Sequence, residues 1–258
     1  MMEGIKVALV TGGASGMGRI CALRLAAAGA RVAILDLNEA GLAQTAALSE
    51  LIQPFRCDIS RRDEVERVVA AVRAQLGPID RLVHAAALMP SHALRDHDAD
   101  AVIALMQINF AGTVYIVKAV LADMLAQQRG QLILFGSVAG KAMVPKMGAY
   151  CASKAAVNVY AETLHHELRG SGVKVHLVCP PAVNTPLVEQ TLATDTPGSL
   201  ALAKESGRLA DPEKIIDAVD RGVARGRPVI YPGEARLLAL WHALLPGLWW
   251  KALMHYER

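Results

Sequence analysis

The stretch Val7-Ala8-Leu9-Val10-Thr11-Gly12-Gly13-Ala14-Ser15-Gly16-Met17-Gly18 decides the fold of this chain, because a strand, a turn and a helix meet in it. Its first part is an apolar run typical of a buried strand, and its second part is a glycine-rich turn. A helical apolar pattern at Ile20, Leu23 and Leu25 follows and ends at Gly29. Glycines let the backbone approach a pyrophosphate, and a helix N-terminus offers free N–H groups. The order strand, glycine turn, helix therefore predicts a nucleotide-binding turn.

The next predicted strand, 31–35, leads into Asp36, which follows the glycines by about 20 residues. A carboxylate at this place binds ribose hydroxyls and repels a 2′-phosphate. No Arg or Lys lies in 12–18 or at Leu37 and Asn38 to offset that repulsion. We therefore expect NAD, rather than NADP, as the cofactor.

Strand-like and helix-like segments alternate along the chain, which predicts an α/β fold. We expect a single doubly wound domain over 1–258, with a parallel sheet of about seven strands and helices on both faces. The expected strands are 5–11, 31–36, 53–58, 79–86, 130–137, 173–179 and 227–231, and the expected helices are 16–28, 38–50, 61–76, 98–127, 148–170 and 211–225. Ligands bind at the carboxyl ends of such strands, where Gly12, Asp36, Asp58, Ala87, Ser137 and Pro180 fall.

Tyr150 and Lys154 stand four residues apart in Tyr-Cys-Ala-Ser-Lys, so a helix places them on one face. A phenol has an unperturbed pKa near ~10, and a nearby cation favours the phenolate. We expect Lys154 to lower the pKa of Tyr150 into the range of acid–base catalysis. Ser137 lies thirteen residues before Tyr150, at the end of the apolar run 132–135. Together the three residues indicate a proton-transfer site.

With these motifs the chain resembles the short-chain dehydrogenase/reductase family, over roughly residues 5 to 232. Members are NAD(P)-dependent oxidoreductases with a Rossmann fold. The resemblance implies that Tyr150 and Lys154 form the catalytic pair, that Ser137 polarises a carbonyl, and that Asn109 supports a proton relay. The implied cofactor contacts are Gly12, Ser15, Gly16, Met17, Gly18, Asp36, Leu37, Asp58, Ile59, Ala85, Ala86, Tyr150, Lys154, Pro180, Val183 and Thr185.

Two motifs depart from the family pattern. The family commonly has Asn-Asn-Ala-Gly where this chain has His84-Ala85-Ala86-Ala87, so Ala87 predicts a tighter or displaced backbone beside the cofactor. Pro181 replaces the usual glycine after Pro180, which stiffens that loop and removes a backbone donor.

The resemblance implies a secondary alcohol or its ketone as substrate, with hydride exchanged with NAD(H). Met143 and Met147, between Ser137 and Tyr150, favour an apolar or bulky substrate, although core packing explains methionines nearly as well. The irregular stretch 186–210 is expected to close over the substrate. Expected substrate contacts are Val138, Met143, Met147, Pro181 and Leu187. The alternatives are a non-catalytic dinucleotide-binding sensor and an NAD-dependent lyase or epimerase on the same fold.

The C-terminal tail, 233–258, is apolar and holds all three tryptophans of the chain. Its uncharged run 237–250 is too short to span a bilayer, and Pro246-Gly247 interrupts it. It could cover the substrate pocket, enter a subunit interface or lie on a membrane surface. We favour a role shared between the substrate pocket and a subunit contact, with peripheral membrane contact as the alternative.

Composition limits the remaining function classes. A formal net charge of +3 does not indicate a nucleic-acid partner. Four cysteines without metal or disulfide spacing indicate a reducing, cytoplasmic compartment. Residues 1–4 lead directly into a strand and leave no room for a signal peptide. No bound metal is expected, because the carboxylates beside His92 and His97 suit helix capping. The family implies a homodimer or homotetramer.

Overall fold

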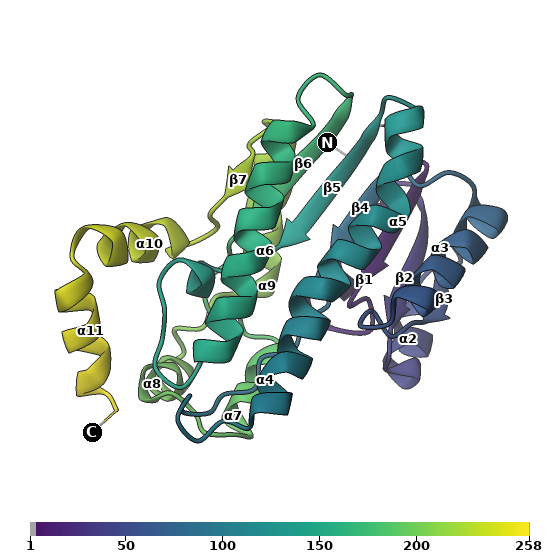
Figure 1. Cartoon of the computed structure of the whole chain (residues 1–258). Coiled ribbons are helices and arrows are strands. Elements are labelled where there is room, and N and C mark those ends of the chain that lie inside the picture. Colours follow the sequence, from purple (N-terminus) through teal and green to yellow (C-terminus); the bar gives the residue numbers. More distant parts are fainter. Residues whose placement is uncertain (1–3, 258) are drawn as a thin grey trace.

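The computed structural model describes residues 4–257 (Figure 1). Met1, Met2, Glu3 and Arg258 lie outside the described residues. The expectation that residues 1–4 leave no room for a signal peptide depends partly on the first three of these residues. The tail expected over 233–258 includes Arg258.

Seven parallel strands form one sheet in the order β3-β2-β1-β4-β5-β6-β7. The strands are β1 (Val7–Thr11), β2 (Arg31–Asp36), β3 (Ile52–Arg56), β4 (Arg81–His84), β5 (Gly130–Phe135), β6 (Val173–Val178) and β7 (Val229–Ile230). The strand order reverses between β1 and β4, and this reversal opens a crevice at their carboxyl ends.

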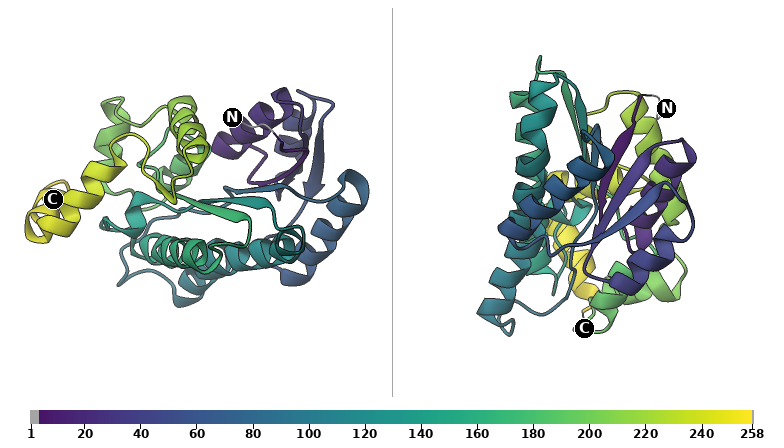
Figure 2. Two further views of the ribbon diagram at one scale, coloured as in Figure 1. Left: turned by 90° about the horizontal axis from the view of Figure 1, so that it is seen from above. Right: turned by 90° about the vertical axis from the view of Figure 1, so that its right-hand side faces the viewer.

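Helices cover both faces of the sheet, as the two turned views show (Figure 2). One face carries α1 (Gly16–Ala27), α2 (Glu39–Ala46) and α9 (Pro212–Ala224). The other carries α3 (Arg62–Leu76), α5 (Gly112–Ala126) and α6 (Gly148–Glu167), with α4 (Ala99–Met106) leading into α5. The predicted doubly wound α/β fold is confirmed.

Strand β1 explains why the sheet is so apolar. All five of its residues are buried, because side chains alternate between two covered faces. Val7 and Leu9 join the core beneath α3, α5 and α6. Ala8 and Val10 join the core beneath α1 and α9.

Two segments differ from the sequence expectation. The stretch 186–210, expected to be irregular, contains α7 (Pro186–Leu192) and α8 (Gly198–Glu205). Pro186 occupies the first turn of α7, where its missing N–H costs nothing, so proline and threonine content misled the expectation of a loop. The expected helix 98–127 is interrupted by a π-helical turn over Gln107–Ala111. The tail adds α10 (Ala235–Leu244) and α11 (Pro246–His255).

Helical caps account for several helix starts. The carboxylate of Asp98 accepts a hydrogen bond from the Ala101 N–H at 2.9 Å and begins α4. Asp211 caps α9 in the same way through the Glu213 N–H at 2.9 Å. The expectation that carboxylates near His97 cap a helix is confirmed for Asp98.

The continuous stretch Ala99–Ala126 is long and apolar enough to cross a bilayer by length and composition. Its α5 part buries Ile116, Val117 and Val120 in the core against the sheet, so packing accounts for its composition. The pair α10–α11 passes the same test only if counted together, and it is bent by 114°.

Candidate active site

The glycine turn after β1 has the shape of a phosphate cradle. Gly12 has φ +70°, and a Cβ there would lie 2.8 Å from the backbone nitrogen of Ala86. A Cβ on Gly18, in the first turn of α1, would lie 2.2 Å from the carbonyl oxygen of Gly12. Only glycine therefore permits this turn, which leaves the N-terminus of α1 open to an anion.

A cleft of about 400 Å³ lies over this turn. It is lined by most of the residues expected to contact the cofactor: Gly12, Ser15, Gly16, Met17, Gly18, Asp36, Leu37, Asp58, Ile59, Ala85, Ala86 and Thr185. The cleft therefore joins a glycine cradle to a carboxylate at the end of β2. These residues fit a dinucleotide with its pyrophosphate on α1 and a ribose at Asp36.

Asp36 is held in place by the backbone. Its two carboxylate oxygens accept hydrogen bonds from the Ala14 N–H at 3.2 Å and the Asn38 N–H at 3.1 Å. The nearby Arg19 is engaged elsewhere, because its guanidinium donates to the Thr45 hydroxyl at 2.8 Å and to the carbonyl of Ala14. Among the described residues, neither Lys nor Arg lines the cleft.

Ser137, Tyr150 and Lys154 line a second cavity of about 190 Å³. The two cavities share the residues Met17, Ala85, Ala87, Thr185 and Leu187, so they form one continuous site. The remaining expected cofactor contacts, Pro180 and Val183, lie in this second cavity. The expected catalytic side chains thus stand where the far end of a dinucleotide would meet a substrate.

Helix α6 positions these groups through a four-residue repeat: Tyr150, Lys154 and Asn158. Asn158 is buried and donates to the Ser137 carbonyl at 3.0 Å, which holds the serine opposite the tyrosine. The sequence reasoning missed Asn158. The spacing of Asn158, four residues after Lys154, could have indicated it, because this spacing places it on the same helix face as Tyr150 and Lys154.

Burial affects the ionisation of Tyr150 and Lys154, the expected catalytic pair. Desolvation raises the pKa of Tyr150 above its ordinary value, and a hydrogen bond with Ser137 lowers it only in part. Desolvation also lowers the pKa of Lys154 to about 8. The expected depression of the Tyr150 pKa by Lys154 is therefore not found. The Nζ atom of Lys154 lies 6.0 Å from the centroid of the Tyr150 ring, and it donates a hydrogen bond to the backbone carbonyl of Phe135 at 2.8 Å.

Asn109 is fully enclosed within the π-helical turn. Its amide donates to the Leu88 carbonyl at 2.9 Å and to the Ser153 hydroxyl at 3.0 Å, while its Oδ1 accepts from the Leu88 N–H at 2.9 Å. The Thr113 hydroxyl donates to the Asn109 carbonyl at 2.7 Å. Asn109 thus joins the loop after β4 to α6.

His84, the first residue of the departing motif His84-Ala85-Ala86-Ala87, links the glycine turn to Asn109 through two threonine hydroxyls. Its Nδ1 lies 2.7 Å from the Thr11 hydroxyl, and its Nε2 lies 2.9 Å from the Thr113 hydroxyl. Thr11 accepts from the Ala86 N–H and Thr113 donates to Asn109, so a neutral ring protonated at Nε2 completes the chain. Burial and the Lys154 charge lower the pKa of His84 to about 3, so the ring stays neutral.

Acid stability should depend on His84. Its folded pKa of about 3 lies below the ordinary value of 6.5, so only the unfolded chain takes up a proton between these values. The contribution of His84 to stability is therefore constant above pH 6.5 and falls as pH decreases toward 3, by up to about 1.4 kcal/mol per pH unit. Urea unfolding of wild type and His84→Asn at several pH values between these limits should show a smaller loss for the variant.

His176 provides an internal control, because burial also lowers its pKa and it is present in both proteins. Its contribution cancels in the difference between the two stability profiles. If the free energy of unfolding decreased equally with pH in the wild type and in His84→Asn, the role assigned to His84 would be contradicted.

The second cavity is almost entirely apolar away from its catalytic end. Of the expected substrate contacts, Val138, Met147, Pro181 and Leu187 line it. Met143 does not: its side chain is 38% exposed, and its carbonyl accepts a hydrogen bond from the Trp249 indole at 2.8 Å. Sequence reasoning did not single out the wall residues Met89 and Val144. The other wall residues lie in segments that it did place near the pocket: the stretch 186–210, with Val188, Leu200 and Ala203, and the tail, with Leu238 and Trp249.

The departures Ala87 and Pro181 both border this site. Ala87 lines both cavities, and Pro181 lines the apolar one. The Pro180 carbonyl accepts from the Val138 N–H at 3.0 Å, which joins this loop to the segment after Ser137. The backbone from Ala182 to Asn184 pairs with Ala210 and thereby closes the base of the α7–α8 segment.

The end of the chain is tied to the same segment. The Glu257 carboxylate accepts from the Gly198 N–H at 2.7 Å, at the start of α8, and lies 3.2 Å from the Lys146 ammonium. Lys146 also pairs with Asp195 at 2.9 Å. The tail is therefore attached both to the α7–α8 segment and to the loop before α6.

Comparison with known proteins agrees with this geometry. The family model described as short chain dehydrogenase matches residues 6–196. The chain is 34% identical over 224 residues to 2-(S)-hydroxypropyl-CoM dehydrogenase 3 of Xanthobacter autotrophicus, covering 83% of this chain and 88% of that protein. It is 37% identical over 222 residues to D-threitol dehydrogenase of Mycolicibacterium smegmatis, covering 83% and 84%. A crystal structure of an actinorhodin polyketide ketoreductase variant with NADPH superposes with a TM-score of 0.79 at 28% identity, over 91% of this chain and 98% of that one.

Proposed function

This chain belongs to the short chain dehydrogenase family, and from that premise we propose that it interconverts a secondary alcohol and a ketone with NAD(H). The observation that carries the proposal is the continuity of two cavities. The glycine cleft fits a dinucleotide, and the cavity joined to it presents Ser137, Tyr150 and Lys154 to a substrate in otherwise apolar surroundings.

Ser137, Tyr150 and Lys154 would each have a separate role in the reaction. Ser137 would donate a hydrogen bond to the substrate oxygen, and Tyr150 would exchange a proton with that oxygen. Lys154 would hold the nicotinamide ribose and supply positive charge beside the phenol. When bound, NAD(H) supplies the hydride acceptor or donor. Burial keeps Tyr150 protonated at neutral pH, which suits donation to a ketone oxygen.

The walls of the second cavity support an apolar substrate. Met147, Leu200 and Trp249 face it from three different elements. The segment 186–210 would contact the substrate through Leu187, Val188 and Leu200, which line the same cavity. The two relatives named above act on chemically different alcohols by their names, so the substrate class rests on this chain's own cavity.

A screen of secondary alcohols of increasing chain length with NAD, read by nicotinamide absorbance, tests the proposal. We expect turnover that increases with apolar length until the cavity is filled. A sensor would bind NAD and show no turnover with any alcohol. A lyase or epimerase would convert its substrate without a net change in nicotinamide absorbance, so product analysis by mass spectrometry or chiral chromatography distinguishes it.

NAD should be preferred over NADP. The held carboxylate of Asp36 would repel a 2′-phosphate, and no cation lines the cleft within residues 4–257 to compensate. The ratio of kcat/KM with NAD to that with NADP should exceed one, and Asp36→Ala should lower this ratio by about tenfold or more. A higher kcat/KM with NADP in the wild type would contradict the assignment.

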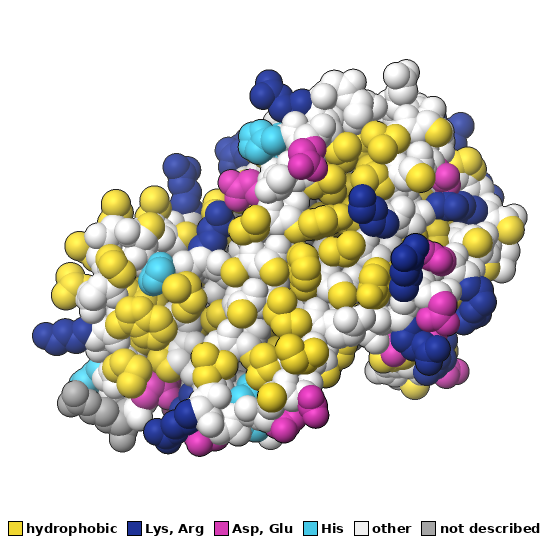
Figure 3. All heavy atoms as spheres, viewed as in Figure 1, with side chains coloured by type: hydrophobic (Ala, Val, Ile, Leu, Met, Phe, Trp, Pro, Cys, Tyr) yellow, Lys and Arg dark blue, Asp and Glu magenta, His cyan; other side chains and the backbone are white. Residues whose placement is uncertain are grey.

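A second copy of the chain is proposed to pack on α5 and α6. These helices present an apolar face that is visible as the central hydrophobic band of the space-filling view (Figure 3). A hollow in this face is lined by Phe110, Val159 and Tyr160, with Val159 67% exposed. Such a face suits a homodimer, or a homotetramer if a second face also pairs. The four cysteines are free and buried, which supports a reducing, cytoplasmic location.

A further inference from the structure

The tail helices α10 and α11 form a bent pair at the edge of the molecule, on the left of Figure 1. The bend of 114° falls at Leu245, immediately before Pro246. The family model ends at residue 196, so this pair lies outside the part that defines the family.

Helix α10 is apolar on both sides, although only one side is packed. Its inward side carries Ala235, Leu238 and Ala239, which join the cluster around Trp249. The opposite side carries Leu237, Leu240 and Leu244, and Leu237 and Leu244 are more than two-thirds exposed. A helix that is apolar all round is normally covered on every side.

Helix α11 repeats the arrangement. Trp249 and Leu253 point inward, and the Trp249 ring packs edge-to-face against Trp241, with centroids 5.2 Å apart. Most of its exposed side chains are again apolar, and the exceptions are Lys251 and His255. We define the tail face as the exposed set Leu237, Leu240, Trp241, Leu244, Leu245, Leu248, Trp250, Met254 and Tyr256.

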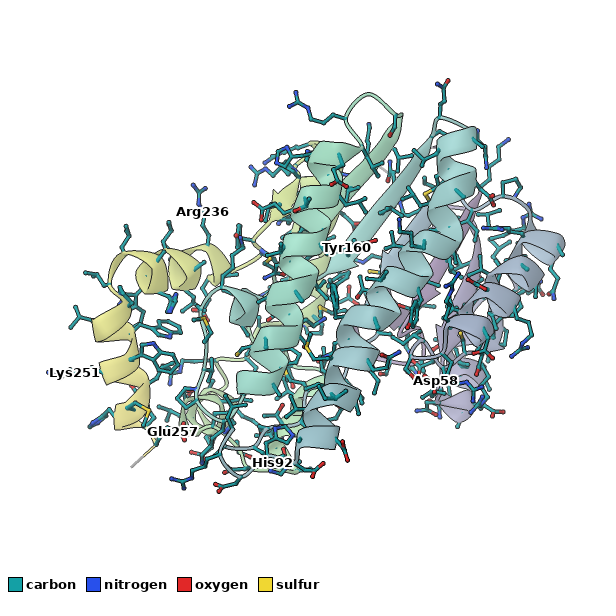
Figure 4. The ribbon with its side chains drawn as sticks, viewed as in Figure 1. Asp58, His92, Tyr160, Arg236, Lys251 and Glu257 are labelled. Atoms are coloured by element: carbon teal, nitrogen blue, oxygen red, sulfur yellow. The ribbon has the colours of Figure 1, made fainter. Side chains whose placement is uncertain are left out.

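The charged side chains within the two tail helices are both basic. Between Ala235 and Tyr256 the charged residues are Arg236 and Lys251, and this segment contains neither Asp nor Glu. Arg236 and Lys251 extend away from the body of the molecule on the two arms of the bend (Figure 4). Of the two flanking carboxylates, Glu234 is exposed at the start of α10, whereas Glu257 is turned toward Lys146 and Gly198.

We propose that the tail face docks this protein peripherally onto an anionic lipid membrane, with the bend at Leu244–Leu248 entering the interface. Exposed leucines supply apolar area, and Arg236 and Lys251 lie where lipid phosphates would be met. Trp241, Trp250 and Tyr256 have amphipathic rings, which favour the headgroup region of a membrane. The break at Pro246 and the bend exclude a straight span, so the pair would lie along the surface.

A second copy fits the tail face less well. In a two-fold pair of tails, Arg236 and Lys251 of one chain would meet an equally cationic face without a carboxylate. The face on α5 and α6 already offers a hollow for a partner copy. The docking proposal does not depend on the reaction, because it concerns residues outside the catalytic cavity.

Binding of the full chain to vesicles tests the proposal. The vesicles contain phosphatidylcholine, either alone or mixed with phosphatidylglycerol. All three tryptophans lie in the tail, so intrinsic fluorescence reports this segment without a label. We expect sedimentation with the anionic vesicles, a blue-shifted emission, and weaker association at high salt. Leu244→Glu combined with Leu248→Glu should weaken vesicle partitioning by about tenfold or more.

Leu48→Glu is the matched control, because Leu48 is 63% exposed and lies beyond α2, outside the tail. It should leave vesicle binding unchanged, and all variants should keep the wild-type thermal midpoint because the substituted positions are exposed. Arg236→Gln with Lys251→Gln should remove the preference for anionic vesicles. Failure of the wild type to bind either vesicle would overturn the proposal. The proposal would also be overturned if the variant with Leu244→Glu and Leu248→Glu still bound vesicles like the wild type. The same holds if these substitutions only dissociated an oligomer in size-exclusion chromatography.

Discussion

Replacement of Tyr150 by phenylalanine should lower kcat by about 10²–10⁴-fold, the usual contribution of a general acid–base group. The ring is buried and would continue to pack, so the loss should come from the missing hydroxyl alone. Affinity for NADH, followed by fluorescence titration, should stay close to that of the wild type. Steady-state kinetics with the best alcohol from the screen measure the effect.

Tyr160→Phe is the matched control for this experiment. Tyr160 lies on the same helix, and its hydroxyl has no hydrogen-bond partner among the described residues. Its loss should leave kcat unchanged. Retention of more than about a tenth of the wild-type kcat in Tyr150→Phe would reject Tyr150 as the proton-transfer group, since a catalytic acid–base loss is larger. A parallel loss of NADH binding would indicate a structural role instead.

Replacement of Trp249 by alanine should affect both stability and substrate choice. The side chain is 4% exposed, closes one wall of the apolar cavity, and donates to the Met143 carbonyl at 2.8 Å. Truncation of such an indole costs about 3–5 kcal/mol, which urea unfolding should detect. The enlarged cavity should also raise kcat/KM for long alcohols relative to short ones.

Two further variants separate these effects. Trp250→Ala removes the neighbouring indole, which is 38% exposed and does not line the cavity, so stability should change by less than about 1 kcal/mol. Trp249→Phe keeps an aromatic wall and removes only the indole donor, so the chain-length preference should stay near that of the wild type. An unchanged preference in Trp249→Ala would remove Trp249 from the substrate wall.

Local sequence signals were sufficient to predict the fold and the place of the candidate site. The strand 31–36 agrees residue for residue with β2, and the other predicted strand boundaries lie within two residues of the observed ones. These predictions succeeded because a buried strand, a glycine turn and a helix each depend on neighbouring residues. The spacing of Tyr150 and Lys154 likewise needs only a helix to place them on one face.

The chemical groups at the carboxyl edge of the sheet could be predicted from the chain alone, because chain order and parallel pairing bring them there. Only the tertiary structure decided their environment. Burial raises the pKa of Tyr150, where adjacency to Lys154 alone predicted the opposite. The folded tail places Trp249 in the wall of the apolar cavity, and Met143 lies outside that wall. Desolvation and cavity shape depend on residues that are distant in the chain. A local sequence pattern therefore cannot predict the pKa of Tyr150 or the residues that line the cavity.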